Sequence, residues 1–178
     1  MKTRLLVLGI PLLLVIAIVA FLSLPWILIF IGIQSQPNPP RPEITYGEFP
    51  FRLEYEIKGE RKVIQDTLIC EFDGFGADEG RGKYRKWKKH LASGNERITL
   101  LEVDQTQEIY YSPGSPNYYM GDLESSGEYR HGFPDALIIE RDGRFTSNRL
   151  IRADELLNKY HIKLISWNPS PPIKNTFK

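Results

Sequence analysis

The chain has 178 residues, 23 of them Lys or Arg and 22 Asp or Glu, so its net charge at pH 7 is +1. This length suits one folded domain with an appendage, and the near-neutral balance argues against a dedicated nucleic-acid binder. Cys70 is the only cysteine, which excludes an intramolecular disulfide and a cysteine-cluster metal site. It lies in the strand-like run TLICEF, so we expect a buried thiol.

The N-terminal 33 residues contain a long apolar run. Lys2 and Arg4 precede residues 5–33, which carry no charged side chain. A helix of about 20 such residues spans a bilayer, whereas the apolar region of a cleaved signal peptide has about 7 to 15. We therefore expect an uncleaved, single-pass signal anchor within residues 5–33. The two basic residues keep the N-terminus inside, so the C-terminal part is exported.

A polar, proline-rich spacer, QSQPNPPRPE, follows at residues 34–43. Proline favours extended chain, so this segment is predicted to form a semi-rigid stalk. The extracytoplasmic domain then comprises residues 44–178, which is long enough to bury one core.

The domain opens with a pattern typical of a β-hairpin. In residues 51–57 apolar and charged side chains alternate, which predicts a strand with one face in water. Gly59 suits the turn, and the return strand places Ile64, Leu68, Cys70 and Phe72 on one side. Four glycines in DGFGADEGRG, residues 73–82, break this pattern, and we expect a loop there.

Residues 81–95, RGKYRKWKKHLASGN, form the densest run of positive charge. At 100° per residue Tyr84, Trp87 and Leu91 fall on one side, which predicts a short amphipathic helix, ended by Gly94. We interpret the basic side as a solvated face. The alternative is a binding patch for anionic lipid or a teichoic-type polymer, formed by the residues that would face outward: Arg85, Lys86, Lys89 and His90.

The remaining segments are mostly strand-like. We expect strands at 97–103 and 107–112, a long irregular stretch at 113–134, a hairpin turning at Asp142–Gly143, a helix at 152–160 and a last strand at 161–167. The fold class predicted from these elements is a small α+β, mainly-β domain, with a mostly antiparallel sheet and two short helices. An immunoglobulin-like β-sandwich is the alternative.

Carboxylates and histidines give few signs of a catalytic or metal site. The three histidines are far apart in sequence and lack the close spacing of zinc ligands. A glycine-rich loop with carboxylates suits calcium, so the metal candidates are Asp73, Asp78 and Glu79, although an ordinary acidic loop is the default. The catalytic candidates, which only the tertiary fold could bring together, are Asp73, His131 and Asp135. No nucleophile motif such as G-x-S-x-G occurs, and we expect no cofactor.

Tyrosines gather in and beside the long irregular stretch, namely Tyr110, Tyr111, Tyr118 and Tyr119. Exposed aromatic rings on loops can stack on sugars or on partner surfaces. We favour a structural interpretation, in which Ile109 and Tyr111 face the core while Tyr118 and Tyr119 pin the loop to the domain.

These features predict a membrane protein with an exported domain that has a non-enzymatic binding or interaction role at the cell envelope. Its expected partners are the membrane itself and a protein or an anionic envelope polymer, with no nucleic acid. A cell-surface hydrolase-type enzyme, with a site formed only by tertiary convergence, is the alternative. The plan of anchor, stalk and small cysteine-poor domain resembles that of single-pass envelope proteins of Gram-positive bacteria, and the resemblance is one of architecture alone.

Overall fold

The computed structural model describes residues 2–123, 129 and 131–178, and their side chains from residue 12 onward. They form two compact units. One unit comprises the N-terminal residues up to Pro40 together with Gly74–Lys86, and the other comprises Arg41–Asp73 and Trp87–Lys178. The second unit contains the cleft described below.

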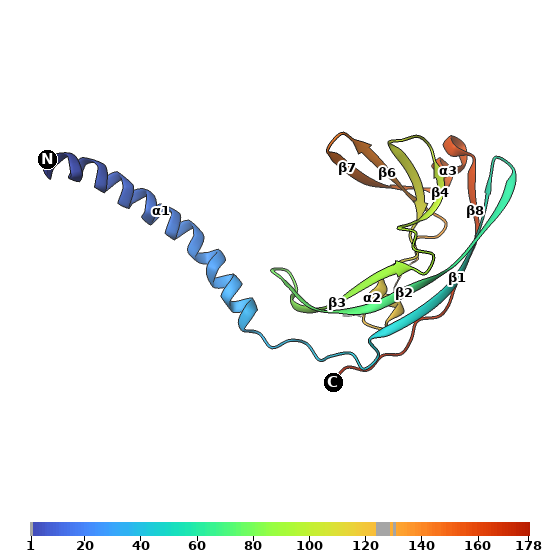
Figure 1. Cartoon of the computed structure of the whole chain (residues 1–178), viewed down its shortest axis with the longest axis horizontal. Coiled ribbons are helices and arrows are strands. Elements are labelled where there is room, and N and C mark those ends of the chain that lie inside the picture. The colour runs from blue at the N-terminus through green and yellow to red at the C-terminus, as the bar shows by residue number, and fades with distance from the viewer. Residues whose placement is uncertain (1, 124–128, 130) are drawn as a thin grey trace. The chain divides into compact units, whose positions relative to one another are not determined.

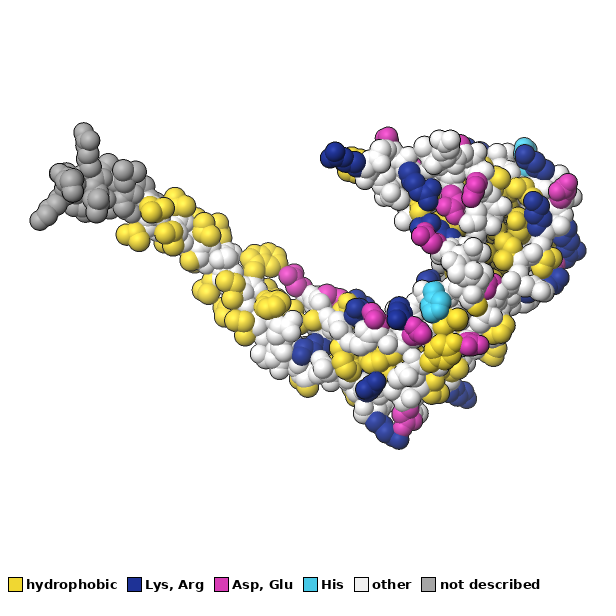
Figure 2. All heavy atoms as spheres, in the orientation of Figure 1, with side chains coloured by type: hydrophobic (Ala, Val, Ile, Leu, Met, Phe, Trp, Pro, Cys, Tyr) yellow, Lys and Arg dark blue, Asp and Glu magenta, His cyan; other side chains and the backbone are white. Residues whose placement is uncertain are grey.

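An apolar helix, α1 (Lys2–Ser35), forms the N-terminal part of the chain (Figure 1). An 18-residue stretch within Leu12–Ser35 has a mean hydropathy of 2.9, and none of it is buried in protein. Figure 2 shows hydrophobic side chains along its surface. A helix of this length and composition is suited to a membrane anchor or to a secretion signal.

The first sheet contains the predicted N-terminal hairpin. Its strands are β1 (Tyr46–Ile57), β2 (Glu60–Asp78), β3 (Gly82–Leu91) and β8 (Ile162–Pro169), in the order β3-β2-β1-β8. β1 and β2 pair without interruption from Tyr46↔Glu71 to Ile57↔Glu60. Lys58 and Gly59 form the turn with φ of 51° and 84°, which is the positive-φ geometry that Gly accommodates in tight hairpins.

The second sheet contains the strands predicted at 97–103 and 107–112 and the hairpin predicted to turn at Asp142–Gly143. Its strands are β4 (Ile98–Glu102), β5 (Gln107–Tyr111), β6 (Ala136–Asp142) and β7 (Phe145–Ile151), in that order. The Asp104 carboxylate accepts hydrogen bonds from the backbone N–H groups of Thr106 and Gln107 in the β4–β5 turn. Gly143, with φ of 57°, lies in the β6–β7 turn. Both sheets are antiparallel, as expected.

Two short helices lie among the strands, α2 (Pro116–Tyr119) and α3 (Ala153–Tyr160). The helix predicted at 152–160 is confirmed, and His161 ends it in the left-handed conformation, with φ of 55°. Leu156 and Tyr160 of this helix are buried, whereas Leu157 is 47% exposed.

One hydrophobic core joins the two sheets and both short helices. Leu53 and Cys70 of the first sheet and Ile109 and Ile138 of the second are each 0% exposed. Burial raises the pKa of the Cys70 thiol to about 12. The mainly-β fold class is therefore confirmed, and so is the buried thiol.

The basic run forms a strand and not the predicted helix. β2 continues through the glycine-rich residues to Asp78, so the expected loop is also wrong, and β3 begins at Gly82. The helical prediction used Tyr84, Trp87 and Leu91. Trp87 and Leu91, four positions apart, share a face in a strand as well as in a helix, whereas Tyr84, three positions before Trp87, shares that face only in a helix. The β2–β3 hairpin satisfies backbone groups that β2 would otherwise leave unpaired, and this tertiary pairing overrides the local pattern.

This correction changes which basic residues share a face. In a strand, successive side chains point to opposite faces. Arg85 and Lys89 therefore lie on the same face of β3 as Trp87 and Leu91, which pack with the core. By the same alternation, Lys86 and His90 lie on the other face of the strand.

Candidate functional site

A cleft of about 260 Å³ lies where the end of β3, the start of β4 and the end of β5 meet. We call it the β3–β5 cleft. Its lining includes Lys89, His90 and Leu91 of β3 together with Glu96, Arg97, Tyr110 and Tyr111. It therefore combines basic side chains and one carboxylate with aromatic and aliphatic walls.

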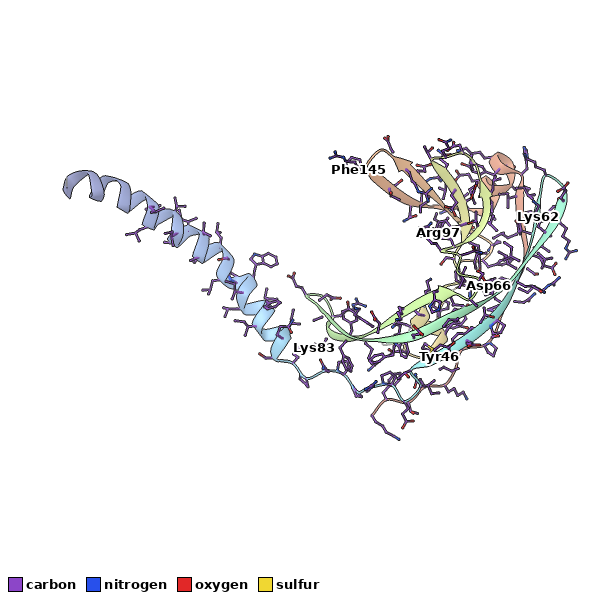
Figure 3. All side chains as sticks on the ribbon, in the orientation of Figure 1. Tyr46, Lys62, Asp66, Lys83, Arg97 and Phe145 are labelled. Atoms are coloured by element: carbon purple, nitrogen blue, oxygen red, sulfur yellow. The ribbon has the colours of Figure 1, made fainter. Side chains whose placement is uncertain are left out.

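The β3–β4 connection positions this cleft, because it carries the chain from the first sheet to the second. Ala92 N–H donates to the carbonyl of Thr67 at 2.9 Å. The Asp66 carboxylate accepts hydrogen bonds from the Ser93 backbone N–H at 3.2 Å and from its hydroxyl at 2.5 Å. Figure 3 labels Asp66 and Arg97 at this crossing. The tight connection holds the basic residues on both sides of the cleft.

Lys89 is a basic residue of the cleft with hydrogen-bond donors to spare. Its ammonium donates one hydrogen bond, to the carbonyl of Gly114 at 2.6 Å. Part of the side chain remains exposed, yet the surrounding protein desolvates the ammonium and lowers its pKa. Among the described residues no carboxylate lies within ion-pair distance of it. A lysine has three donors, so two stay available to an anionic ligand.

Arg97, by contrast, is held by neighbouring side chains. Its guanidinium lies 3.2 Å from the Glu96 carboxylate and 3.7 Å from that of Glu108. It also lies 5.6 Å from the centre of the Tyr110 ring, a distance at which a cation is attracted to an aromatic face. These contacts orient Arg97 along the wall of the cleft, with its charge partly neutralised.

A second cluster surrounds His131, in the loop before β6. The Trp167 indole N–H donates to His131 Nε2 at 2.9 Å, and Tyr111 Oη lies 3.2 Å from Nδ1. An indole N–H only donates, so Nε2 is unprotonated and the imidazole is neutral with its proton on Nδ1. Burial lowers the pKa of His131, which favours the same neutral form. Neither ring nitrogen is left to act as a base.

The catalytic candidates from the sequence have separate partners. The Asp135 carboxylate accepts a hydrogen bond from Ala153 N–H at 2.9 Å, at the start of α3. Asp73 is exposed on β2. His131 is enclosed by aromatic rings, with Tyr129 and Trp167 at centroid distances of 5.6 and 5.5 Å. The described hydrogen bonds do not join the three residues.

The metal candidates lie near the β2–β3 turn. The Asp78 carboxylate accepts hydrogen bonds from the backbone N–H groups of Gly80 and Arg81 and pairs with the Arg81 guanidinium at 2.7 Å. These contacts lower the pKa of Asp78. Glu79 is exposed. Within the part of the chain that the structure describes, no three His, Cys, Asp or Glu side chains form a group that could hold a metal ion.

The structural interpretation of the tyrosines is confirmed. Tyr111 and Tyr119 are each 1% exposed, and the Tyr119 hydroxyl donates to the carbonyl of Pro113 at 2.7 Å. Tyr118 stacks on Tyr129, with ring centroids 4.1 Å apart. Two features escaped the sequence reasoning, namely the Trp167–His131 hydrogen bond and the bond from Trp87 Nε1 to the buried Asp122 carboxylate, at 2.7 Å. Each of these bonds joins two residues more than thirty positions apart in the sequence. The spacing of residues within one segment therefore cannot predict them.

Comparisons of the chain with protein-family models, with curated proteins and with solved structures find no match. The function must therefore be argued from the residues of the β3–β5 cleft and from the apolar helix.

Proposed function

We propose that this protein is a single-pass, membrane-anchored binding protein whose extracytoplasmic domain holds an anionic envelope polymer in the β3–β5 cleft. The anchor within residues 5–33 would stay uncleaved, with the N-terminus inside. Residues 34–43 would connect it to the domain of residues 44–178. The apolar surface of α1 supports the anchor, because residues 12–35 bury none of their side chains in protein.

The observation that carries the ligand proposal is the Lys89 ammonium. It is desolvated, it donates to a single carbonyl, and it lies in a cleft of about 260 Å³ with His90 and Arg97 nearby. An anionic group placed there would gain charge-assisted hydrogen bonds, and it would favour the charged form of a lysine that the protein alone disfavours.

A polymer with spaced anionic groups fits this cleft better than a large folded partner. The cleft is small, and basic and acidic side chains are interspersed over the face of the domain in Figure 2. A broad acidic protein surface would meet acidic as well as basic groups on that face. A single phosphate group of a flexible polymer can bind within the cleft without contacting the rest of that face. Of the predicted binding residues, Lys89 and His90 line the cleft and are included in this proposal.

The test measures binding of soluble polyglycerol phosphate to the full chain in detergent. We expect Lys89→Glu to weaken binding at least tenfold, because it replaces an attraction by a repulsion at the ligand. Lys62→Glu makes the same charge change on an exposed residue of β2 outside the cleft and should change binding less than twofold.

Two outcomes would overturn the proposal. Equal weakening by both substitutions would show that only net charge matters. Binding of polyglutamate in preference to polyglycerol phosphate would assign the cleft to an acidic protein partner.

A further inference from the structure

The end of the β2–β3 hairpin, Gly74–Lys86, belongs to the same compact unit as the apolar helix α1 and the spacer that follows it. We call this segment the hairpin end. A cavity of about 430 Å³ lies between it and α1, and the residues around that cavity are Phe30, Ile33, Gln34, Ala77, Asp78 and Glu79. Figure 1 shows the C-terminal end of α1 beside this hairpin. The hairpin end is therefore a neighbour of the last turns of the helix.

The proline-rich spacer also contacts the hairpin end. The Arg85 guanidinium donates to the carbonyl of Pro40 at 3.3 Å. The Gln36 side chain lies so close to Gly82 that a Cβ on this glycine would be 2.7 Å from the Gln36 side-chain oxygen. The spacer thus contacts β3 at two places, and these contacts keep the hairpin end near the helix.

The length of α1 determines where its C-terminal end lies in the proposed membrane anchor, on which this inference rests. Its 34 residues measure about 51 Å at 1.5 Å per residue. The hydrocarbon core of a bilayer is about 30 Å thick, and the whole bilayer with its headgroups is about 40–45 Å thick. Lys2 and Arg4 favour the inner headgroup layer, so the last turns of α1 reach the outer one. The hairpin end, which contacts those turns, lies there as well.

The charge of the hairpin end suits a layer of anionic headgroups. It contains two acidic residues and four basic ones, namely Arg81, Lys83, Arg85 and Lys86. The rest of residues 44–178 contains 16 basic and 19 acidic residues, so the positive charge of the domain is concentrated at the hairpin end. Basic side chains near an anionic membrane surface are attracted to it. Figure 3 labels Lys83 on this hairpin.

The hairpin end also carries an aromatic side chain of the kind that favours the membrane interface. The Arg81 guanidinium lies 4.1 Å from the centre of the Tyr84 ring and pairs with the Asp78 carboxylate at 2.7 Å. Tyrosine is enriched at the level of the headgroups, where its ring meets apolar groups and its hydroxyl meets water.

We propose that the hairpin end is a membrane-surface contact that binds the headgroups of anionic phospholipids beside the anchor. Arg85 and Lys86, which the sequence singled out for anionic lipid, belong to it. The contact would hold the domain at the bilayer surface, whereas a flexible spacer alone would leave the domain free to move away.

Fluorescence quenching of the full chain in reconstituted vesicles tests this contact. A thiol-reactive fluorophore is attached at Glu79→Cys in the hairpin end, or at Lys62→Cys, an exposed position near the other end of β2. A phosphatidylcholine with a nitroxide on its headgroup quenches fluorophores that lie near the bilayer surface. The vesicles contain phosphatidylcholine alone or equal parts of phosphatidylcholine and phosphatidylglycerol. The native Cys70 is 0% exposed and its thiol pKa is raised to about 12, so it takes up little label.

We expect at least threefold stronger quenching at Glu79→Cys than at Lys62→Cys in the anionic vesicles. Quenching at Glu79→Cys should be at least twofold stronger in the anionic vesicles than in the neutral ones, because the headgroup charge attracts the hairpin end.

Substitutions in the Glu79→Cys chain identify the residues that respond to the headgroup charge. Lys83→Glu together with Lys86→Glu should abolish the difference between anionic and neutral vesicles. Lys62→Glu together with Lys163→Glu makes the same charge change at exposed residues outside the hairpin end and should preserve that difference.

Failure of the anchor and failure of the headgroup contact give different results. A chain that an alkaline carbonate wash removes from the vesicles would overturn the proposed anchor, and this inference with it. A chain that stays in the vesicles would overturn the headgroup contact alone by any of three results: equal quenching at the two labelled positions, equal quenching in the two kinds of vesicle, or equal effects of the two pairs of substitutions.

Discussion

At His131, one hydrogen-bond donor determines the protonation state of the imidazole. The Trp167 indole N–H donates to Nε2 at 2.9 Å, and protonation of that nitrogen would remove its capacity to accept. The rings of Tyr111, Tyr118 and Tyr129 surround the imidazole with little polar compensation for a charge. In this cluster the histidine packs among aromatic rings and makes two hydrogen bonds.

The neutral state of His131 predicts a pH dependence of folding stability. Burial lowers its pKa in the folded protein, so stability is unaffected above the unfolded value of about 6.5. As the pH falls from there toward the lower folded value, the unfolded chain takes up a proton that the folded chain resists, and stability decreases. Unfolding midpoints of the full chain measured between pH 7.5 and 5 should show this decrease.

His131→Phe removes the titrating group and should flatten that part of the pH profile, although the protein becomes less stable overall. A profile that keeps its slope in His131→Phe would show that another group causes the effect.

At the scale of elements, the C-terminal tail packs closely against the residues after α2. Ile173 N–H donates to the carbonyl of Tyr119 at 2.9 Å. Gly121 has φ of +64°, and a Cβ at this position would lie 2.5 Å from the backbone oxygen of Ile173. The glycine therefore has two roles, a positive φ and a close approach of two backbone segments.

Gly121→Ala is expected to destabilise the domain by more than about 1 kcal/mol, since it adds strain and displaces a backbone segment. Two matched substitutions separate these causes. Gly59→Ala adds the positive-φ strain alone, and Gly132→Ala adds neither, because a Cβ at either site meets no atom within 4 Å. The unfolding free energy should be highest for Gly132→Ala, lower for Gly59→Ala and lowest for Gly121→Ala. Equal unfolding free energies for Gly59→Ala and Gly121→Ala would contradict the close packing of Gly121 against Ile173.

The sequence predicted those elements whose turns carry a local signal. Gly59 and Asp142–Gly143 mark hairpins that the structure confirms. It failed for β3, where Tyr84, Trp87 and Leu91 have helical spacing and pairing with β2 overrides this local pattern. It also failed to extend β2 across residues 73–78, because glycines in a strand resemble a loop when the partner strand is unknown.

The site was less predictable than the fold. Lys89 and His90 were among the residues singled out for their charge, but their cleft depends on the β3–β4 connection and on β5. Tyr110 and Arg97 join it through tertiary packing alone. Charge density identified the segment, and only the pairing of strands showed which of its side chains share a cavity.

At the scale of the whole molecule, the proposed topology can be tested with tags at both ends of the full chain. An uncleaved anchor predicts one membrane-bound species that carries the N-terminal and the C-terminal tag. External protease acting on intact cells should remove the C-terminal tag and spare the N-terminal one, because Lys2 and Arg4 favour an inside start. A soluble species without the N-terminal tag would show cleavage, and a protected C-terminal tag would contradict export.

The binding of an anionic polymer at Lys89 is the central claim, and the salt dependence of that binding tests it most directly. The affinity of the full chain for polyglycerol phosphate should fall as salt rises, since charged contacts are screened. Removing one cation contact with Lys89→Gln should reduce the slope of log affinity against log salt by about one. An unchanged slope in Lys89→Gln, or an affinity independent of salt, would contradict the claim.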